Sequence, residues 1–124
     1  LPSLEVGKLA FRYFDLPHYK ESSFFQTHFA CYQSAPDYFE LVCPGVGKDV
    51  AAHELVRALE EEGGTVGRTL AFGDSGNDIP LLRAADIAVA MGNASPAAKE
   101  AASYVTDDVH HDGVAHALAH LGYI

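Results

Sequence analysis

The sequence predicts an α/β protein whose parallel strands are joined by crossover helices, and three observations support this prediction. Short apolar runs alternate with helix-period segments from residue 69 to the end of the chain. The apolar run at residues 69–72 leads directly into a turn, residues 73–78, that carries two carboxylates and an amide. Residues 1–44 instead combine strand-like segments with a short helix. We therefore expect two parts, residues 1–44 and residues 45–124.

The first part is expected to form a small sheet with one helix. Residues 8–14 alternate as a half-buried strand does, and Leu16-Pro17-His18 forms a turn that can open a short helix. Two further strands are expected at residues 27–33 and 38–43, joined by a hairpin turn at residues 34–37. The aromatic side chains of this part lack the basic interleaving of a base-stacking platform, so we expect them in the core: Tyr13, Phe14, Phe24, Phe25, Phe29, Tyr32, Tyr38 and Phe39.

In the second part the hydrophobic period changes to that of a helix. Apolar residues recur at three- and four-residue spacing from Ala51 to Leu59, and Gly63-Gly64 closes this surface helix. Strands are then expected at residues 69–72, 87–91 and 104–106. One helix is expected to follow the first strand and to end at residue 85, and two more are expected at residues 95–102 and 114–121. Short apolar strands that alternate with helices indicate a parallel sheet.

The composition excludes several classes of protein. Of 124 residues, 48% are hydrophobic and 20% are charged, as in an ordinary globular domain. The 17 acidic and 8 basic residues give a net charge of -9, which would repel a nucleic acid. No apolar stretch approaches the roughly 18 residues that cross a bilayer, and the two cysteines form no paired framework. We expect a cytoplasmic protein without nucleic acid or membrane partners.

The turn at residues 73–78 is the strongest candidate site. Asp74 follows a strand and Asp78 starts the next helix, so both carboxylates can approach one point at the carboxyl end of the sheet. Mg²⁺ prefers a few carboxylates together with water and phosphate oxygens. Asp is also a favoured helix N-cap, and Pro80 follows closely, so Asp78 could simply cap its helix. Both roles stay open, because one carboxylate can serve in both.

Two other patterns are weaker candidates. Residues 45–49 resemble a nucleotide-binding loop, but Val42 stands where the first glycine is needed and Asp49 where Ser or Thr is needed. What remains is Lys48 near a helix start, suited to a phosphate or a carboxylate, although most surface lysines have no such role.

Histidines near the carboxyl end could suggest zinc, yet we favour a solvated surface for them: His110, His111, His116 and His120.

Taken together, several segments in chain order resemble the C-terminal part of haloacid-dehalogenase-superfamily phosphatases, and the Cof-like sugar-phosphate phosphatases most closely. These segments are Lys48 at a helix start and residues 69–78, 88–94, 104–106 and 112–115. Residues 1–44 resemble, more weakly, the closing half of that family's α/β cap. The resemblance implies a partial cap at residues 1–44 and the C-terminal half of a Rossmann-like core at residues 45–124.

The resemblance also implies roles for individual residues. In such enzymes an Asp attacks the phosphoryl group and water hydrolyses the phospho-aspartyl intermediate, with Mg²⁺ between nucleophile and phosphate. Asp74 resembles the direct metal ligand, and Asp78 the catalytic acid that holds metal-bound water. Asn77 resembles a phosphate contact, and Lys48 the catalytic lysine that pairs with the nucleophile and the phosphoryl oxygens. The implied substrate is a small phosphorylated metabolite.

The chain departs from the family because it contains no Asp-x-Asp motif, which carries the nucleophile. We therefore expect a fragment of a longer phosphohydrolase, inactive alone. In this architecture the missing first strand lies beside residues 69–72, so an apolar edge would remain for the missing amino-terminal half or for a second copy of the chain. The alternatives are a non-catalytic binding or regulatory module that binds phosphate or Mg²⁺, and a different α/β class, such as a phosphotransferase or a receiver-like protein, with Asp74 as phosphate acceptor.

Overall fold

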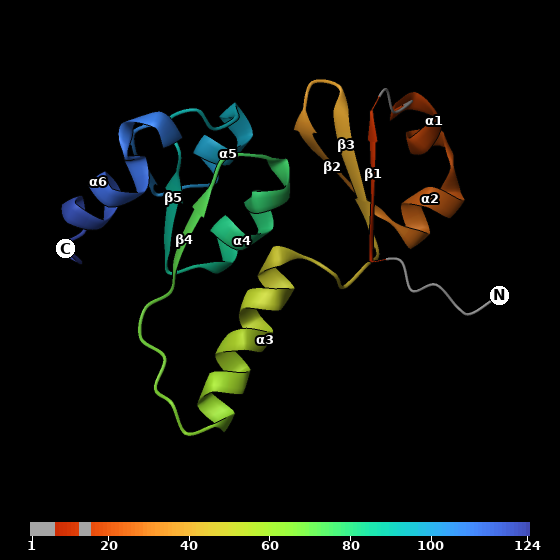
Figure 1. Ribbon diagram of the computed structural model, residues 1–124. Helices are drawn as coiled ribbons and strands as arrows, with labels where there is room; N and C mark the ends of the chain where they lie inside the picture. The colour runs from red at the N-terminus through yellow and green to blue at the C-terminus, as the bar shows by residue number, and fades with distance from the viewer. Residues whose placement is uncertain (1–6, 13–15) are drawn as a thin grey trace. The chain divides into compact units, whose positions relative to one another are not determined.

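The computed structural model describes residues 7–12 and 16–124 of the chain, which packs as two units, Leu1–Val46 and Gly47–Ile124 (Figure 1). The described strands form two three-stranded sheets, one in each unit. Tyr13 and Phe14, which end the first predicted strand, lie outside the described residues. None of the described helices is both long and apolar enough to cross a membrane.

The first unit is built on an antiparallel sheet in the order β1-β3-β2. The strands are β1 (Lys8–Arg12), β2 (Ala30–Ala35) and β3 (Tyr38–Val42). β2 and β3 form the predicted hairpin, and a bulge between Gln33 and Ala35 precedes its turn. The central strand β3 is the most buried: Leu41 is 2% exposed, and the buried Glu40 carboxylate accepts a 2.8 Å hydrogen bond from Lys8 Nζ on β1.

Two short helices, α1 (Leu16–Glu21) and α2 (Ser23–His28), occupy the segment where one helix was expected. The strand predicted at residues 27–33 is therefore wrong at its start, and β2 begins only at Ala30. The reason is a helix cap: Ser22 Oγ accepts a hydrogen bond from Phe25 N (3.4 Å). Phe39 is buried as predicted, but Phe24 is 59% exposed and packs edge-on against Phe25 at the surface.

The second unit contains the predicted parallel sheet, in the order β4-β5-β6. Its strands are β4 (Leu70–Gly73), β5 (Ile87–Ala90) and β6 (Tyr104–Val105). Two helices join them, α4 (Ile79–Ala84) and α5 (Pro96–Glu100), and α6 (Gly113–His120) follows the sheet. Two 3₁₀ turns, η1 (Gly76–Asp78) and η2 (Val109–His111), precede α4 and α6.

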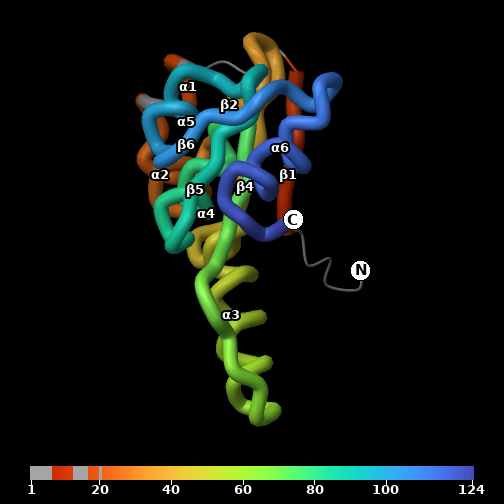
Figure 2. The backbone as a smooth tube through the Cα atoms, turned by 90° about the vertical axis from the view of Figure 1, so that its left-hand side faces the viewer, coloured from red at the N-terminus to blue at the C-terminus, as the bar shows by residue number. Residues whose placement is uncertain are grey.

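Helices cover both faces of this sheet, which is why its strands read as continuous apolar runs (Figure 2). On one face of β5, Ala88 and Ala90 pack in a cluster with Leu82 of α4 and Ala98 of α5. On the other face, Val89 packs with Ile87 and with Ala117 of α6. The central strand is thus buried on both sides, as expected for a strand flanked by crossover helices.

The first helix of the second unit is α3 (Lys48–Glu61), and its apolar residues have the predicted helical spacing. The apolar face of such a helix is usually buried, but here it is not. None of its residues is fully buried, and Leu55 and Leu59 are 61% and 44% exposed. The helix ends at the predicted glycines: Gly63 has a φ of +85°, and Gly64 N donates to Leu59 O (2.9 Å). Much of its apolar face is therefore open to solvent.

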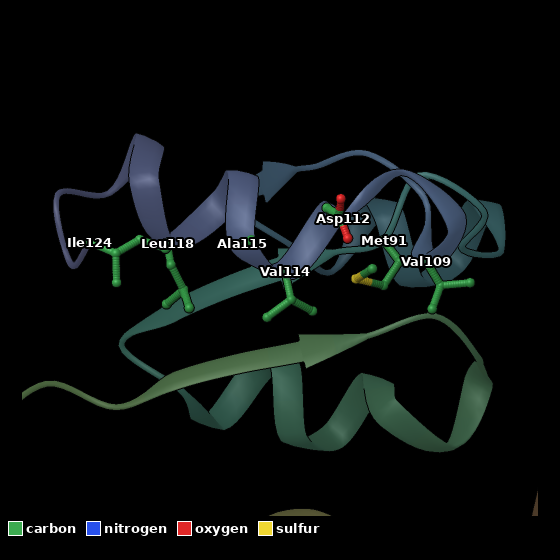
Figure 3. A pocket seen from close by; sticks show the side chains of 8 residues that line it. Met91, Val109, Asp112, Val114, Ala115, Leu118 and Ile124 are labelled. Carbon is green, nitrogen blue, oxygen red and sulfur yellow. The ribbon is translucent and has the colours of Figure 1, made fainter.

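Among the described strands β4 is an edge of the parallel sheet, and apolar grooves lie on both sides of it. A groove of about 340 Å³ follows α6, whose side chains Val114 and Leu118 point toward β4 (Figure 3). A second groove of about 340 Å³ lies between α3, α4 and β4, and Val56, Leu70 and Leu81 are among its lining residues. The edge strand is thus flanked by apolar surface on each face.

The carboxyl-terminal histidines lie on the surface and contact neighbouring side chains. His116 Nδ1 lies 2.7 Å from Asp107 Oδ2, His111 Nδ1 lies 2.8 Å from Asp108 Oδ1, and the His120 ring stacks on Tyr104 with centroids 4.5 Å apart. Within residues 7–12 and 16–124, no group of three or more His, Cys, Asp or Glu side chains is arranged to hold a metal ion.

The start of α6 is fixed by a close approach of two backbones. A Cβ on Gly113 would lie 2.1 Å from Asp107 O, so only glycine fits there. The buried Thr106 side chain follows β6 and donates a 2.7 Å hydrogen bond from Oγ1 to Gly113 O. This contact ties the end of the sheet to the first turn of α6.

We expect Thr106→Val to lower the free energy of unfolding by about 1 kcal/mol, because the buried hydrogen bond to Gly113 is lost while the shape of the side chain is nearly kept. Urea denaturation followed by circular dichroism measures this. The control is Thr65→Val in the exposed segment before β4, which should change stability by less than about 0.5 kcal/mol. Equal losses in the two variants would contradict the role given to Thr106.

Candidate phosphate and metal site

The turn after β4 folds around one buried carboxylate, that of Asp78. Gly73 ends β4, and a Cβ at this position would lie 2.6 Å from Asp78 Cβ, so a larger residue would push the turn open. Ser75 is the N-cap of η1, and Pro80 stands in the first turn of α4, where a missing N–H costs nothing. These local preferences produce the sharp passage from strand to helix.

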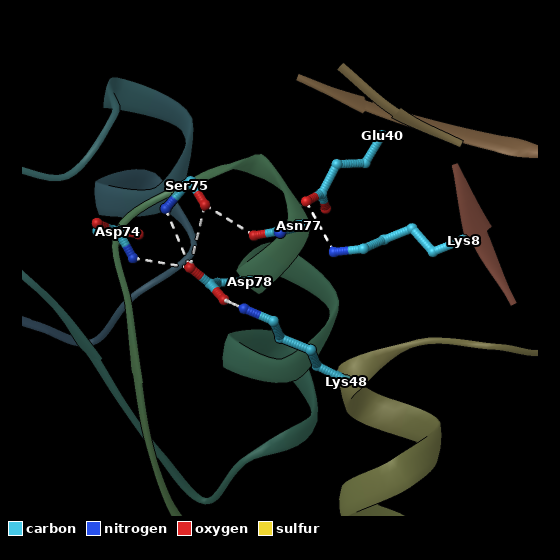
Figure 4. A network of polar contacts seen from close by, with 7 residues as sticks. All are labelled: Lys8, Glu40, Lys48, Asp74, Ser75, Asn77 and Asp78. Atoms are coloured by element: carbon cyan, nitrogen blue, oxygen red, sulfur yellow. Dashed lines mark hydrogen bonds and ion pairs between the residues drawn. The ribbon is translucent and has the colours of Figure 1, made fainter. Parts of the chain in front are cut away.

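Both oxygens of the Asp78 carboxylate have partners within the second unit (Figure 4). Oδ2 accepts hydrogen bonds from the backbone N of Asp74 (3.0 Å) and of Ser75 (3.1 Å). Oδ1 pairs with Nζ of Lys48, the first residue of α3. Asp78 is only 5% exposed, and with Ser75 it forms a capping box. The sequence left open that Asp78 caps its own helix; Asp78 is the N-cap residue of α4, but its side chain makes no cap hydrogen bond to that helix and accepts from the N-cap of η1, Ser75, instead.

The surroundings of Asp78 keep it ionised. Burial favours the neutral acid, but the Lys48 ammonium and the amides of Asp74 and Ser75 outweigh it and hold the pKa of Asp78 below its usual value. Lys48 keeps about half of its side chain exposed, at 52%. Because an ammonium has three protons, the one that binds Asp78 leaves Lys48 able to donate to an anion as well.

Asp74 has a different position in the same turn. Its backbone is held on both sides, since its N donates to Asp78 and its O accepts a 2.8 Å hydrogen bond from Ser95 N. Its side chain is exposed, and in Figure 4 the carboxylate points away from Asp78. The turn therefore joins Asp74 to Asp78 through the backbone and does not direct their carboxylates to one point.

Asn77 lies between these groups and contacts Ser75, whose Oγ is 2.7 Å from Asn77 Oδ1 and 3.3 Å from Asp78 Oδ2. The Ser75 hydroxyl thus contacts two of the four predicted site residues, Asn77 and Asp78, and a third, Lys48, pairs with the other oxygen of Asp78. The fourth, Asp74, begins the same turn.

Sequence reasoning missed two residues that shape this site. The Ser75 hydroxyl contacts two of the predicted residues, and the Ser-x-x-Asp spacing of a capping box could have indicated it. Ser95 holds the backbone of Asp74 and also caps α5, since its Oγ accepts from Ala98 N (3.3 Å). Its cap is visible in the sequence, but its contact with Asp74 depends on the packing of two separate elements.

The sequence profile of the haloacid dehalogenase-like hydrolases matches residues 16–118. The chain belongs to this family. A pyridoxal phosphate phosphatase of Escherichia coli is 34% identical over 113 residues, which are 89% of this chain and 40% of that protein. A 5-amino-6-(5-phospho-D-ribitylamino)uracil phosphatase of Bacillus subtilis is 41% identical over 87 residues, which are 70% of this chain and 34% of that protein.

Solved structures agree with the family. A HAD subclass IIB sugar phosphatase, 32% identical, superposes with a TM-score of 0.82 over 98% of this chain and 45% of that one. The predicted α/β Rossmann-like fold and the resemblance to Cof-like members of the superfamily are thereby confirmed. This haloacid dehalogenase-like chain spans less than half of the length of these relatives.

We expect Asp78 to support the fold in a pH-dependent way. Its folded pKa lies below the unfolded value of about 3.9, so its contribution is present above that pH and is lost as the pH falls through the folded pKa. Asp78→Asn should lower the free energy of unfolding at pH 7 and flatten its decrease below about pH 5. Urea denaturation over a pH series measures both effects.

The control for this series is Glu60→Gln, which neutralises an exposed carboxylate of α3. The free energy of unfolding of this variant should equal that of the unmodified chain at every pH. If Asp78→Asn loses stability in acid as steeply as the unmodified chain does, the contribution assigned to Asp78 is wrong.

Proposed function

We propose that this chain supplies the metal- and phosphate-binding residues of a Mg²⁺-dependent phosphohydrolase that acts on small phosphorylated metabolites, with sugar phosphates as the favoured class. The observation that carries the proposal is the Lys48–Asp78 ion pair in the turn at the carboxyl end of β4, in a chain of the haloacid dehalogenase-like family. The similar E. coli and B. subtilis proteins are phosphatases, and the solved relative is a sugar phosphatase.

Phosphate binding is assigned to Lys48 and Asn77. A phosphate dianion beside two carboxylates needs positive charge and hydrogen-bond donors to offset the repulsion. The half-exposed Lys48 ammonium supplies charge, and Asp78 holds it at the turn. Asn77 supplies a side-chain amide in the same turn.

The donor set suits Mg²⁺, which is commonly bound by one or two carboxylates and completes its shell with water and phosphate oxygens. We assign Asp74 as the direct ligand, because its carboxylate is exposed at the end of β4. Both oxygens of Asp78 already have partners, so we assign Asp78 to holding metal-bound water and to positioning Lys48. Bound Mg²⁺ would neutralise charge on the phosphoryl oxygens.

The reaction is nucleophilic catalysis in two steps. A carboxylate oxygen attacks phosphorus, the phosphorus–oxygen ester bond breaks, and the alcohol leaves; water then cleaves the phospho-aspartate. The sequence contains no Asp-x-Asp motif, so the attacking carboxylate would come from outside these 124 residues, and the chain alone would be inactive. In this proposal residues 1–44 are the closing half of a cap, and residues 45–124 are the C-terminal half of the core.

The test is hydrolysis of p-nitrophenyl phosphate by the whole polypeptide that its gene encodes. We expect Asp74→Ala and Lys48→Ala each to lower kcat by about 10²-fold or more, since the first removes the assigned Mg²⁺ ligand and the second removes the positive charge that would face the phosphoryl group. Asp74→Ala should also raise the Mg²⁺ concentration needed for half-maximal rate. Glu62→Ala, at an exposed carboxylate beyond α3, is the control. Full activity in both site variants would refute the assignment.

A second candidate function is a non-catalytic module that binds phosphate or Mg²⁺, and the absence of an Asp-x-Asp motif from the sequence favours it. The same assay separates the two. A whole polypeptide that binds inorganic phosphate and Mg²⁺ but does not hydrolyse the ester would be such a module.

The proposal includes a partner for the edge strand β4. Polypeptide outside these 124 residues would add a strand parallel to β4 and cover the grooves along α6 and α3. The exposed apolar side chains beside this edge support it, since Val114 is 43% and Val109 63% exposed. Without that polypeptide, a second copy of the chain would occupy the same edge.

We expect the chain alone to self-associate with increasing concentration, and Val114→Lys to weaken this association about tenfold or more, because it places a charge in the groove beside β4. Sedimentation velocity over a concentration series measures it. The matched control is Val105→Lys on β6, where the side chain is similarly exposed, at 45%, but lies outside both grooves. A folded chain that stays monomeric at every concentration would contradict the role of the edge.

A further inference from the structure

We infer that Lys99 is a positioning residue for the proposed metal site: it closes the segment 92–99 into a loop, and this loop holds the backbone of Asp74. The inference rests on the assignment of Asp74 as the Mg²⁺ ligand in the proposed function. It adds to that assignment a residue of α5 that acts through the backbone.

The side chain of Lys99 closes the loop. Its Nζ comes from the last turn of α5 and donates a 2.6 Å hydrogen bond to Gly92 O, in the turn after β5. Such a bond from an ammonium to a carbonyl is charge-assisted and therefore strong. Within the same segment Lys99 N donates to Ser95 O (3.0 Å), and Ser95 Oγ accepts from Ala98 N (3.3 Å). Lys99 thus joins the end of α5 to the turn that precedes this helix.

The loop is anchored to both neighbouring turns at the carboxyl edge of the sheet. On one side Gly92 N donates to Asp107 O (3.0 Å), after β6. A Cβ on Gly92 would lie 2.7 Å from Asp108 N, so only glycine lets these two turns approach so closely. On the other side Ser95 N donates to Asp74 O (2.8 Å). The carbonyl of Asp74 is therefore bound by a loop whose other end is fixed after β6.

The direction of the Asp74 carboxylate depends on the backbone on both sides of it. Asp74 N donates to Asp78, and Asp74 O accepts from Ser95 N. Because the Asp74 side chain is exposed, these backbone bonds largely set where its carboxylate points. A carboxylate that is already held in place binds a cation more tightly than one that must be ordered on binding. Lys99 therefore adds to cation affinity by restricting the loop that carries the Ser95 N–H.

A direct effect of the charge of Lys99 would have the opposite sign. Any positive charge repels a bound cation, so removal of the charge alone should strengthen cation binding. Loss of a positioning contact should weaken it. Lys99→Met separates the two effects, because it keeps a long straight side chain and the helix propensity but loses both the charge and the donors.

The first measurement is hydrogen exchange at single amides of the whole polypeptide without ligands. We expect Lys99→Met to speed exchange of the Ser95 N–H about fivefold, because the loop that holds it against Asp74 O opens more often. The Met91 N–H donates to Gly73 O (3.0 Å), and its unchanged rate would show that the variant is folded. Unchanged exchange at Ser95 would overturn the inference.

The second measurement is binding of Mn²⁺, which suits the same oxygen ligands as Mg²⁺ and is detected through the relaxation of water protons. We expect Lys99→Met to weaken Mn²⁺ binding to the whole polypeptide about fivefold, and Lys99→Arg, which keeps charge and donors, to restore most of it. In the Asp74→Ala background Lys99→Met should add nothing, since the carboxylate that the loop positions is gone. The control is Arg83→Met, at an exposed cation of α4, which should not weaken binding.

Unchanged or tighter Mn²⁺ binding by Lys99→Met, or a further loss in the Asp74→Ala background, would overturn the inference. Failure of the proposed function has a different signature: the unmodified polypeptide would bind no Mn²⁺ at all, while exchange at Ser95 would still respond to Lys99→Met.

Discussion

The buried carboxylate of Asp78 is the group on which the site of this chain depends. A buried charge is costly unless every oxygen has a partner, and here the partners are the amides of Asp74 and Ser75 and the ammonium of Lys48. These partners come from the end of β4 and from the start of α3, so one carboxylate fixes both elements. The arrangement needs Gly73, because no larger residue would let Asp78 approach the strand so closely.

The two carboxylates of this turn, four residues apart, have different surroundings. Asp78 lies inside the turn, where its charge is balanced by protein groups, and so it organises the site. Asp74 lies at the surface, and its carboxylate points away from Asp78, so its charge is open to an external cation. The sequence left capping and ligand binding open for Asp78, and in the structure its carboxylate is bound by the amides of the turn and by Lys48, while Asp74 has the exposed carboxylate.

The parts predicted well from sequence are those in which local pattern and packing agree. The strands β4 and β5 are short apolar runs between helix signals, and the structure pairs them in parallel. The strand predicted at residues 27–33 is right from Ala30 on and wrong at its start, because a short aromatic run fits a strand and a helix equally well and the cap at Ser22 extends α2 to His28. The pair of Lys48 with Asp78 joins residues far apart in the chain, so no spacing rule could indicate it. The family resemblance assigned both residues to one site, but it paired Lys48 with the nucleophile and the phosphoryl oxygens.

The turn that holds Asp74 and Asp78 follows β4, which is also an edge of the parallel sheet among the described strands. Parallel strands of one sheet have their carboxyl ends at the same edge of the sheet. A strand added parallel to β4 would therefore end beside the turn that holds Asp74 and Asp78. Its last residues would face the Lys48 ammonium, which has protons left for a further anion. In the proposed function, the polypeptide that would cover the apolar edge would also be the one to supply the attacking carboxylate.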